Sequence, residues 1–296
     1  MNFQRDHFVN NTCMVFRDRM LAYLILMVSL ILFFNCIFDR TAIPELFRSE
    51  SINSKIKNDG TNCPFGNPLA TDPKRYGKIH IIHREGYTLG HSSKYRMAIW
   101  VCEEILSEEL LGKATRRNHF KPEPLLSKGE RAELSDYKNS GYDRGHLAAA
   151  DNYRSDQRLN DESFYLSNVV PQDHSFNAGI WKKLEEQIRS WVKRYNRVIV
   201  ITVPVYIDDK NQFPRFIEKN NDLTVPNHFF KILVRDENGS TLLLAFLAKH
   251  KKATNISLES FLTTVDLAEE HTQLNFLPNI PDVDESLEAT VGVYWP

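Results

Sequence analysis

The feature that most constrains the fold is an amphipathic helix followed at once by an apolar strand. From Ala178 to Tyr195, apolar residues recur at helical spacing and form one stripe. Its members are Trp181, Leu184, Ile188, Trp191, Val192 and Tyr195. The next run, Arg197–Ile207, is apolar and rich in β-branched residues, which is typical of a central strand. The pair predicts a sheet with a helix packed on it.

Further strands are expected on both sides of this pair in the chain. Residues 78–91 ("KIHIIHREGYTLGH") alternate in polarity and predict one or two strands. Residues 228–248 predict two strands joined at Asn238-Gly239, a hairpin signal. Residues 95–111 fit a helical period but also a strand as far as Val101. The fold class expected is α+β, a central, mostly antiparallel sheet flanked by helices.

Bulk composition excludes some classes of protein. Among 296 residues, 42% are hydrophobic, enough for a sizeable core, and the formal net charge is −1. No global basic field can therefore attract nucleic acid, and local clusters must meet any anionic substrate. The four cysteines, Cys13, Cys36, Cys63 and Cys102, form no CxxC pair. Reduced thiols are expected, with a Cys63–Cys102 bridge as the open alternative.

The N-terminus carries an apolar segment that lies apart from the globular part. Residues 20–38 include no charge and are long enough to cross a bilayer. We expect a membrane anchor there, with a cleaved signal or targeting sequence as the alternative. The expected organisation is an N-terminal segment 1–19, the anchor 20–38, a polar linker 39–60 and a globular domain 61–296.

A dense group of charged residues precedes an apolar run in "YDRGHLAAADN" (142–152). His146 in this group suits proton transfer near neutral pH. On the helix, Asn177 lies on the apolar stripe and Glu185 at its edge, about 12 Å apart along the axis. One direct metal ligand and one water-mediated partner would suit this spacing, an arrangement that Mg²⁺ tolerates. The competing interpretation is structural: a helix-capping Asn177 and a Glu185 paired with an arginine.

Two long motifs carry a resemblance to a known family. Residues 140–152 ("SGYDRGHLAAADN") resemble the signature of the ββα-metal DNA/RNA non-specific endonucleases. Residues 161–191, which include "FYLSNVVPQ" and "NAGIWKKLE", are similar to the second motif of that family. The resemblance extends over about 63–276 and is strongest to the animal mitochondrial endonuclease G and exo/endonuclease G-like branch. It implies a ββα-metal finger made of the DRGH strand, its partner and the Asn177 helix.

The resemblance also implies a catalytic centre. His146 takes the place of the general base, and Asn177 that of the direct Mg²⁺ ligand, with Mn²⁺ as a substitute for Mg²⁺. Glu185 takes the place of the residue that orients a metal-bound water.

The remaining matched residues support or contact the substrate. Arg144 corresponds to a residue beside the phosphate, and Arg189 to an arginine near the scissile phosphate. Asn168 corresponds to an amide that supports the catalytic geometry. An upstream substrate-contacting arginine is matched to Arg117, although Arg116 is adjacent.

The implied function is a sugar-non-specific nuclease acting on DNA and RNA to leave 5′-phosphate ends. A homodimer in mitochondria, at the inner membrane facing the intermembrane space, is implied too; a secreted or endomembrane nuclease is the alternative. One departure is Thr202-Val203-Pro204, where the family has Thr-Gly-Pro. Valine lacks the conformational freedom of glycine, so an altered turn is expected. It motivates another hypothesis, a catalytically weakened nucleic-acid-binding protein.

Overall fold

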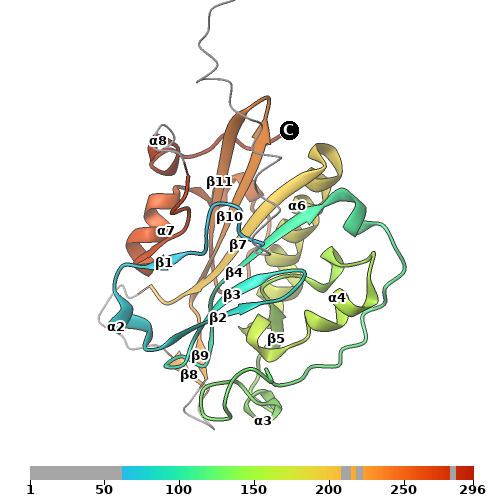
Figure 1. Ribbon diagram of the computed structural model, residues 1–296, viewed down its shortest axis with the longest axis vertical. Coiled ribbons are helices and arrows are strands. Elements are labelled where there is room, and N and C mark those ends of the chain that lie inside the picture. Colours follow the sequence, from blue (N-terminus) through green and yellow to red (C-terminus); the bar gives the residue numbers. More distant parts are fainter. Residues whose placement is uncertain (1–61, 208–214, 218–222, 281–284) are drawn as a thin grey trace, which may run out of the picture. The chain divides into compact units, whose positions relative to one another are not determined.

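The apolar run after the amphipathic helix forms β7 (Arg197–Val205), a strand in the middle of an antiparallel sheet (Figure 1). The computed structural model describes residues 62–207, 215–217, 223–280 and 285–296. Within them the sheet has seven strands, in the order β12-β11-β10-β7-β4-β3-β2. The other strands are β2 (Ile79–His83), β3 (Thr88–Ser92), β4 (Met97–Leu106), β10 (His228–Glu237), β11 (Ser240–Lys249) and β12 (Leu262–Thr263). The predicted α+β class with a central antiparallel sheet is confirmed.

Two predicted local features have clear structural outcomes. The hairpin between β10 and β11 turns at Asn238 and Gly239, which have φ angles of 53° and 83°. Both angles are positive, as a two-residue turn of this kind requires. The ambiguous segment 95–111 is strand through Leu106 and then a short 3₁₀ helix, η3 (Ser107–Leu110).

Both faces of β7 are buried against different elements. Val198 and Val200 belong to the core cluster beneath α6 (Lys182–Tyr195), together with Ile188 and Trp191. Ile199, Ile201 and Val203 belong to the cluster on the other face, which includes residues of α7 (Val265–Thr272). The alternating side chains of one strand therefore join two cores, as expected for a central strand.

Val203 lies inside this strand and not in a turn. It is completely buried, and it pairs with Phe230 of β10 in regular antiparallel register. Val203 is not among the described non-glycine residues with positive φ. Nothing here requires glycine, so the expectation of an altered turn is wrong.

A second, two-stranded sheet leads into the long helix. β5 (Asp143–His146) pairs antiparallel with β6 (Val169–Gln172), and the chain then enters α5 (His174–Phe176), a π-helical turn (Asn177–Trp181) and α6. Asp173 caps this helical stretch, since its Oδ1 accepts from the backbone N–H groups of Ser175 and Phe176 at 2.8 and 3.3 Å. The helix thus begins earlier than predicted, and Asn177 is not its cap.

The remaining elements are short and surround these two sheets. They are β1 (Leu69–Ala70), α2 (Pro73–Tyr76), α3 (Leu134–Tyr137), η4 (Ala150–Asn152), α4 (Gln157–Glu162), η5 (Leu166–Asn168), β8 (Arg215–Phe216), β9 (Thr224–Val225), η7 (Leu258–Phe261), β13 (Leu274–Asn275) and α8 (Glu285–Glu288).

The predicted segments 1–19, 20–38 and 39–60 lie outside the described residues. Among the helices of the described ranges, none combines the length and the apolar character that a membrane span needs. Cys63 and Cys102 are buried reduced thiols, so the open alternative of a bridge between them is not realised. The Cys102 thiol donates to the carbonyl of Asn62 at 3.2 Å.

Candidate active site

His146 ends β5 and is fixed by the pairing of this strand. It lies opposite Val169 of β6, and its neighbour Gly145 pairs with Val170. A Cβ at Gly145 would come within 2.1 Å of the Gln172 side chain, so a larger residue there would displace this buried side chain. The glycine of the DRGH motif therefore has a packing reason, and the position of His146 depends on it.

The imidazole of His146 is only 7% exposed and lies between aromatic rings. The centroid of the Phe164 ring is 4.8 Å away, edge to face, and that of Phe120 is 5.4 Å away. Burial, and then the charge of nearby Arg116, lower the pKa of His146 to about 3. The ring is therefore neutral at physiological pH and can accept a proton. Its buried Nε2 has no hydrogen-bond partner among the described residues.

Asn168 lies behind His146 rather than in a cavity. Its Oδ1 accepts from the backbone N–H of Ala148, and its Nδ2 donates to the carbonyls of Ala148 and Ser163, all at 2.9 Å. The backbone carbonyl of Asn168 also accepts from the N–H of Leu147 at 3.0 Å. These bonds hold the backbone just after His146, and Asn168 lines neither of the two cavities described below.

Asn177 is placed by the π-helical turn, whose regularity is broken at Gly179 (φ −103°, ψ −112°). Its side-chain Nδ2 donates to Oδ2 of Asp143 at 2.9 Å. The amide nitrogen is thus engaged with β5, and the amide oxygen is the atom left to bind a cation.

Four of the predicted site residues line one cavity of about 260 Å³, namely His146, Asn177, Glu185 and Arg189. Helix α6 and the π-helical turn supply three of them, and β5 supplies the fourth. The wall also includes Ala149, Ala150, Asp151, Ala178, Lys182 and Arg116. Three side chains of this cavity are cationic and two are acidic, so it can receive an anion next to a metal ion.

Behind the cavity lies a buried polar network that the sequence analysis missed. Glu103 of β4 accepts from Asn152 Nδ2 at 3.0 Å and from the Tyr153 hydroxyl at 2.8 Å. Asn152 Oδ1 in turn accepts from Arg189 Nη1 at 3.3 Å. Lys231, 2% exposed, donates to Thr202 Oγ1 at 2.7 Å. The available signal in the sequence was the presence of charged residues inside two apolar strands: two glutamates in "WVCEEIL" and one lysine in "FFKILV".

Glu185 and Lys231 each shift the pKa of the other within this network. Burial raises the pKa of the Glu185 carboxyl, while the charges of Lys231 and Arg189 act in the opposite direction. Burial lowers the pKa of Lys231, and the carboxylates of Glu185 and Glu103 oppose that shift. The cation of Lys231 thus sits where it compensates two carboxylates.

The two adjacent arginines of the upstream loop have different surroundings. Arg117 is half exposed and forms an ion pair with Asp161 at 3.1 Å, outside the cavity. Arg116 lines the cavity instead. Arg144 is exposed, with its guanidinium carbon 4.4 Å from the centroid of the Phe120 ring, and it lines a neighbouring cavity.

The donors of the cavity fit a hard divalent cation. The described residues contain no group of three or more His, Cys, Asp or Glu side chains with metal-binding geometry. Asn177 offers an amide oxygen and Glu185 a carboxylate, both oxygen donors, and Mg²⁺ accepts few protein ligands because it keeps several waters.

Comparison with known proteins settles the family. Residues 67–283 match the family model of the DNA/RNA non-specific endonucleases. The chain belongs to this family. Human mitochondrial endonuclease G is 36% identical over 221 residues, covering 72% of this chain and 74% of that protein. Mitochondrial Nuclease 1 of Schizosaccharomyces pombe is 31% identical over 210 residues, covering 66% and 65%. A solved EndoG/EndoGI complex matches with a TM-score of 0.65 and 27% identity, over 74% of this chain and 91% of that one.

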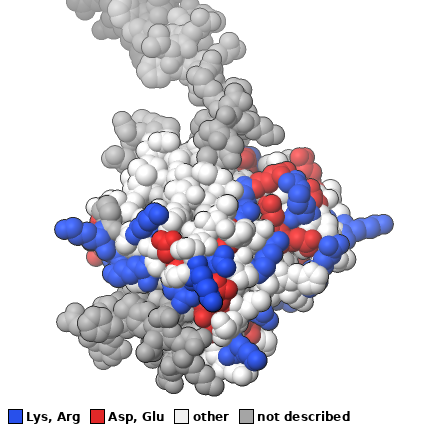
Figure 2. Space-filling model, turned by 60° about the horizontal axis from the view of Figure 1, so that its bottom comes forward, with Lys and Arg blue, Asp and Glu red and all other residues white. Residues whose placement is uncertain are grey.

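As a DNA/RNA non-specific endonuclease, the chain is a phosphodiester hydrolase of a metal-dependent family. The face drawn in Figure 2 carries several separate groups of Lys and Arg with acidic residues among them, in agreement with the near-zero net charge. The cavity itself is lined by three cationic side chains, Arg116, Lys182 and Arg189.

Proposed function

We propose that this endonuclease uses Mg²⁺, with Mn²⁺ as a substitute, to hydrolyse phosphodiester bonds of DNA and RNA to 5′-phosphate products. The observation that carries the proposal is the shared cavity. There a neutral buried imidazole (His146) meets an amide oxygen (Asn177) and a carboxylate (Glu185), with Arg116, Lys182 and Arg189 in the wall.

His146 is the general base in this proposal. Its neutral ring accepts the proton of the attacking water at a ring nitrogen. Without substrate, burial and, to a smaller extent, the charge of Arg116 keep the pKa of His146 low. A bound phosphodiester brings a negative charge that offsets Arg116, so the ring becomes more basic when substrate is in place. Asn168 keeps the backbone after His146 in position.

Asn177 would hold the metal directly through Oδ1, and Glu185 would hold one of its waters. When bound, the cation neutralises charge on the phosphate and stabilises the leaving oxygen. Asp143 orients the Asn177 amide, because it engages the nitrogen and leaves the oxygen for the metal. Second-sphere bonds of this kind typically affect metal affinity.

The arginines would neutralise the phosphate. Arg189 donates to Asn152, and Arg116, which lines the cavity, would take the substrate-contacting role expected for Arg117. Such contacts recognise the backbone and carry no base information, which fits low sequence specificity.

The test is cleavage by the purified full chain. Supercoiled plasmid and RNA are incubated with Mg²⁺ or with EDTA, beside His146→Ala and Asn177→Ala and the control Lys128→Ala on an exposed loop. We expect cleavage that requires the metal and falls at least 100-fold in the two site variants, since general base catalysis contributes about 10²–10⁴ in rate. Product ends are identified by their 5′-phosphate. Equal cleavage in EDTA, or by His146→Ala, would refute the mechanism.

Location and assembly form a further part of the proposal. Relatives named mitochondrial support a mitochondrial location. We propose that segment 20–38 anchors the chain in the inner membrane, facing the intermembrane space, and that the chain is a homodimer. Subfractionation, carbonate extraction and light scattering test the three statements. Cleavage of the segment together with glycosylation of Asn255 would instead favour a secreted or endomembrane nuclease.

A further inference from the structure

A second cavity of about 590 Å³ lies next to the catalytic one. We propose that it binds the unpaired base of the nucleotide beside the scissile phosphate, an inference that rests on the proposed nuclease function. Arg116 and Asn177 line both cavities, so the two cavities adjoin at the place where the phosphate would bind. A nucleotide whose phosphate lies beside these two residues therefore has its base next to the second cavity.

The walls of this cavity suit both parts of a nucleotide. Phe120, Tyr142 and Tyr137 supply aromatic surface, and Arg116, Lys138 and Arg144 supply positive charge against the single carboxylate of Asp143. A flat base stacks on aromatic rings and on guanidinium planes, while its phosphate pairs with cations. Neither an apolar ligand nor a bare anion would use both kinds of wall.

Arg144 already shows the stacking geometry. Its guanidinium carbon lies 4.4 Å from the centroid of Phe120, which is close to the usual spacing for a cation over a ring. Arg144 is exposed, lies over the Phe120 ring and lines the cavity together with it. Tyr142 is half-buried and presents part of its ring to the same space.

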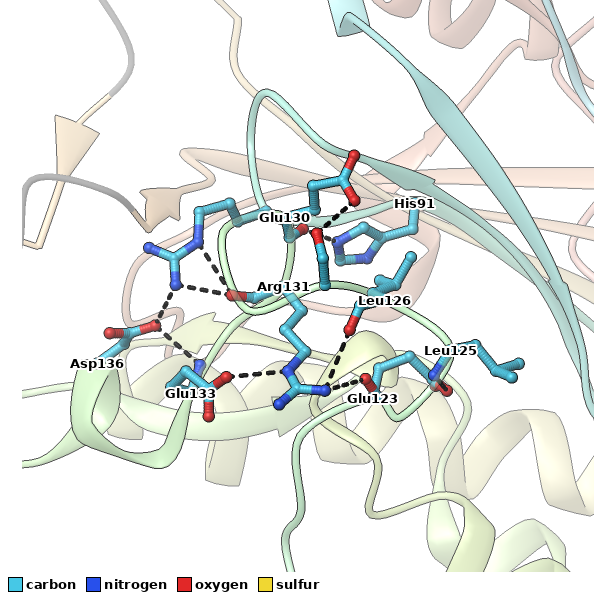
Figure 3. Close-up of polar contacts among 10 residues, drawn as sticks. His91, Glu123, Leu125, Leu126, Glu130, Arg131, Glu133 and Asp136 are labelled. Atoms are coloured by element: carbon cyan, nitrogen blue, oxygen red, sulfur yellow. Dashed lines mark hydrogen bonds and ion pairs between the residues drawn. The ribbon is translucent and has the colours of Figure 1, made fainter.

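The wall formed by α3 and the residues after it is held from behind by a network of polar contacts (Figure 3). Arg131 donates through Nη1 to the carbonyls of Glu123 and Leu126, at 2.8 and 3.1 Å. Its Nε donates to Glu133 at 2.9 Å, directly before α3. The Arg131 side chain thus links the loop at Glu123 and Leu126 to Glu133, at the start of the cavity wall.

The same segment is tied to the large sheet. Arg96, in the turn between β3 and β4, donates through Nη2 to the carbonyl of Arg131 at 2.7 Å and to Asp136 at 3.0 Å. His91 of β3 contacts the carbonyl of Glu130 at 2.9 Å (Figure 3). The wall is therefore formed before any ligand arrives, which reduces the entropy lost on binding.

The geometry favours unpaired nucleic acid. In a double helix the bases are stacked and paired inside the duplex, so a base must leave the stack to enter a cavity. Single strands, loops and locally melted sites meet this condition at no cost. Because every base has a stacking face, the cavity would select strandedness and not sequence.

The experiment measures binding apart from cleavage. The full chain carrying His146→Ala is titrated with labelled dT₄ and with a fully abasic tetramer of the same phosphate number, followed by anisotropy. We expect dT₄ to bind about tenfold more tightly than the abasic tetramer, since one base–aromatic stack has about this effect. Tyr142→Leu, which keeps an apolar side chain but removes the ring, should abolish the preference, whereas Tyr142→Phe should retain it. Lys138→Ala should weaken the binding of both tetramers by the same factor. Lys128→Ala should change the binding of neither.

The outcomes separate the two proposals. Equal binding of both tetramers, or a preference that survives Tyr142→Leu, means that the cavity takes no base and at most a second phosphate. If Tyr142→Leu does not fold, Phe120→Leu provides the same comparison in the same binding assay. Cleavage of plasmid and RNA by the wild-type chain is measured in parallel. Cleavage without base preference refutes this inference alone, and base-dependent binding without cleavage refutes the proposed function alone.

Discussion

Asn177 and Asp143 are joined across the ββα unit by a hydrogen bond of 2.9 Å from Nδ2 to Oδ2. Without Asp143 the amide of Asn177 can turn either its nitrogen or its oxygen toward the metal. We therefore expect Asp143→Ala to raise the Mg²⁺ concentration for half-maximal cleavage by about tenfold, the usual range for loss of a second-sphere partner. The maximal rate at saturating Mg²⁺ and substrate should change much less, because no reacting group is removed.

The matched control is Asp161→Ala, which removes a carboxylate that pairs with Arg117 outside the cavity. Its Mg²⁺ dependence should equal that of the wild type. If Asp143→Ala shows the wild-type Mg²⁺ requirement, the bond does not orient a ligand.

Lys231 supports the site from inside the sheet. Its Nζ bonds to Thr202, and its charge faces the buried carboxyl of Glu103, whose pKa burial raises to about 7. Lys231→Met should lower the free energy of unfolding by about 3 kcal/mol, because removal of one partner leaves a buried charge uncompensated. Urea denaturation at pH 8 measures this difference.

The double variant decides whether charge is the cause. Glu103→Gln removes the carboxylate and keeps the shape, so Lys231→Met/Glu103→Gln should recover part of the stability lost in Lys231→Met. If the destabilisations of the two single variants simply add in the double variant, the cause is instead lost packing against Trp181. The centroid of that ring lies 4.9 Å from Lys231 Nζ.

Periodicity and turn chemistry were enough to predict most of the sheet. The central strand follows from an apolar run, and the β10–β11 hairpin from Asn238-Gly239, whose positive φ angles few other residues adopt. The start of the helix was misplaced, because Asp173 and Asn177 are both good capping residues. The π-helical turn between them breaks the period on which the prediction relied.

The site was predictable in part. His146, Asn177, Glu185 and Arg189 do share one cavity, although no local pattern requires this. The sequence cannot tell which of Arg116 and Arg117 faces the cavity, since the loop that carries them has no regular alternation of polar and apolar residues. Long-range partners are also invisible to local patterns.

The buried network shows this most clearly. Asn152 meets Glu103 from 49 positions away in the chain, and that contact exists only after β4 has joined the sheet.

Val203→Gly tests the significance of the departure from the family pattern. Because Val203 is fully buried in a regular strand, glycine there leaves a cavity and loosens the backbone. We expect about 2–3 kcal/mol of destabilisation and no gain in cleavage at a temperature where both proteins are folded. Val203→Ala, which removes only the methyl groups, should fall between the two. A higher rate for Val203→Gly would revive the hypothesis of a weakened enzyme.

His91 makes the stability of the fold depend on pH. Burial lowers the pKa of its ring to about 4, against a usual value of 6.5, although the Glu130 carbonyl, which contacts its Nε2, opposes the shift. Above pH 6.5 the ring is neutral in both the folded and the unfolded chain, so its contribution to stability is complete. Between pH 6.5 and 4 only the unfolded chain takes up the proton, and the free energy of unfolding falls by up to about 3 kcal/mol.

His91→Gln removes this proton uptake while its amide can still donate to the Glu130 carbonyl. The variant should therefore lose less stability than the wild type between pH 7 and pH 4, in urea titrations at closely spaced pH values. His119→Gln, on the exposed upstream loop, controls for the loss of a histidine. His146 and His250, whose pKa values burial also lowers, remain in all three proteins, so the difference between the curves isolates His91. Parallel curves for His91→Gln and the wild type would show that the ring takes up its proton equally well in the folded and the unfolded chain, so that its pKa is not lowered by folding.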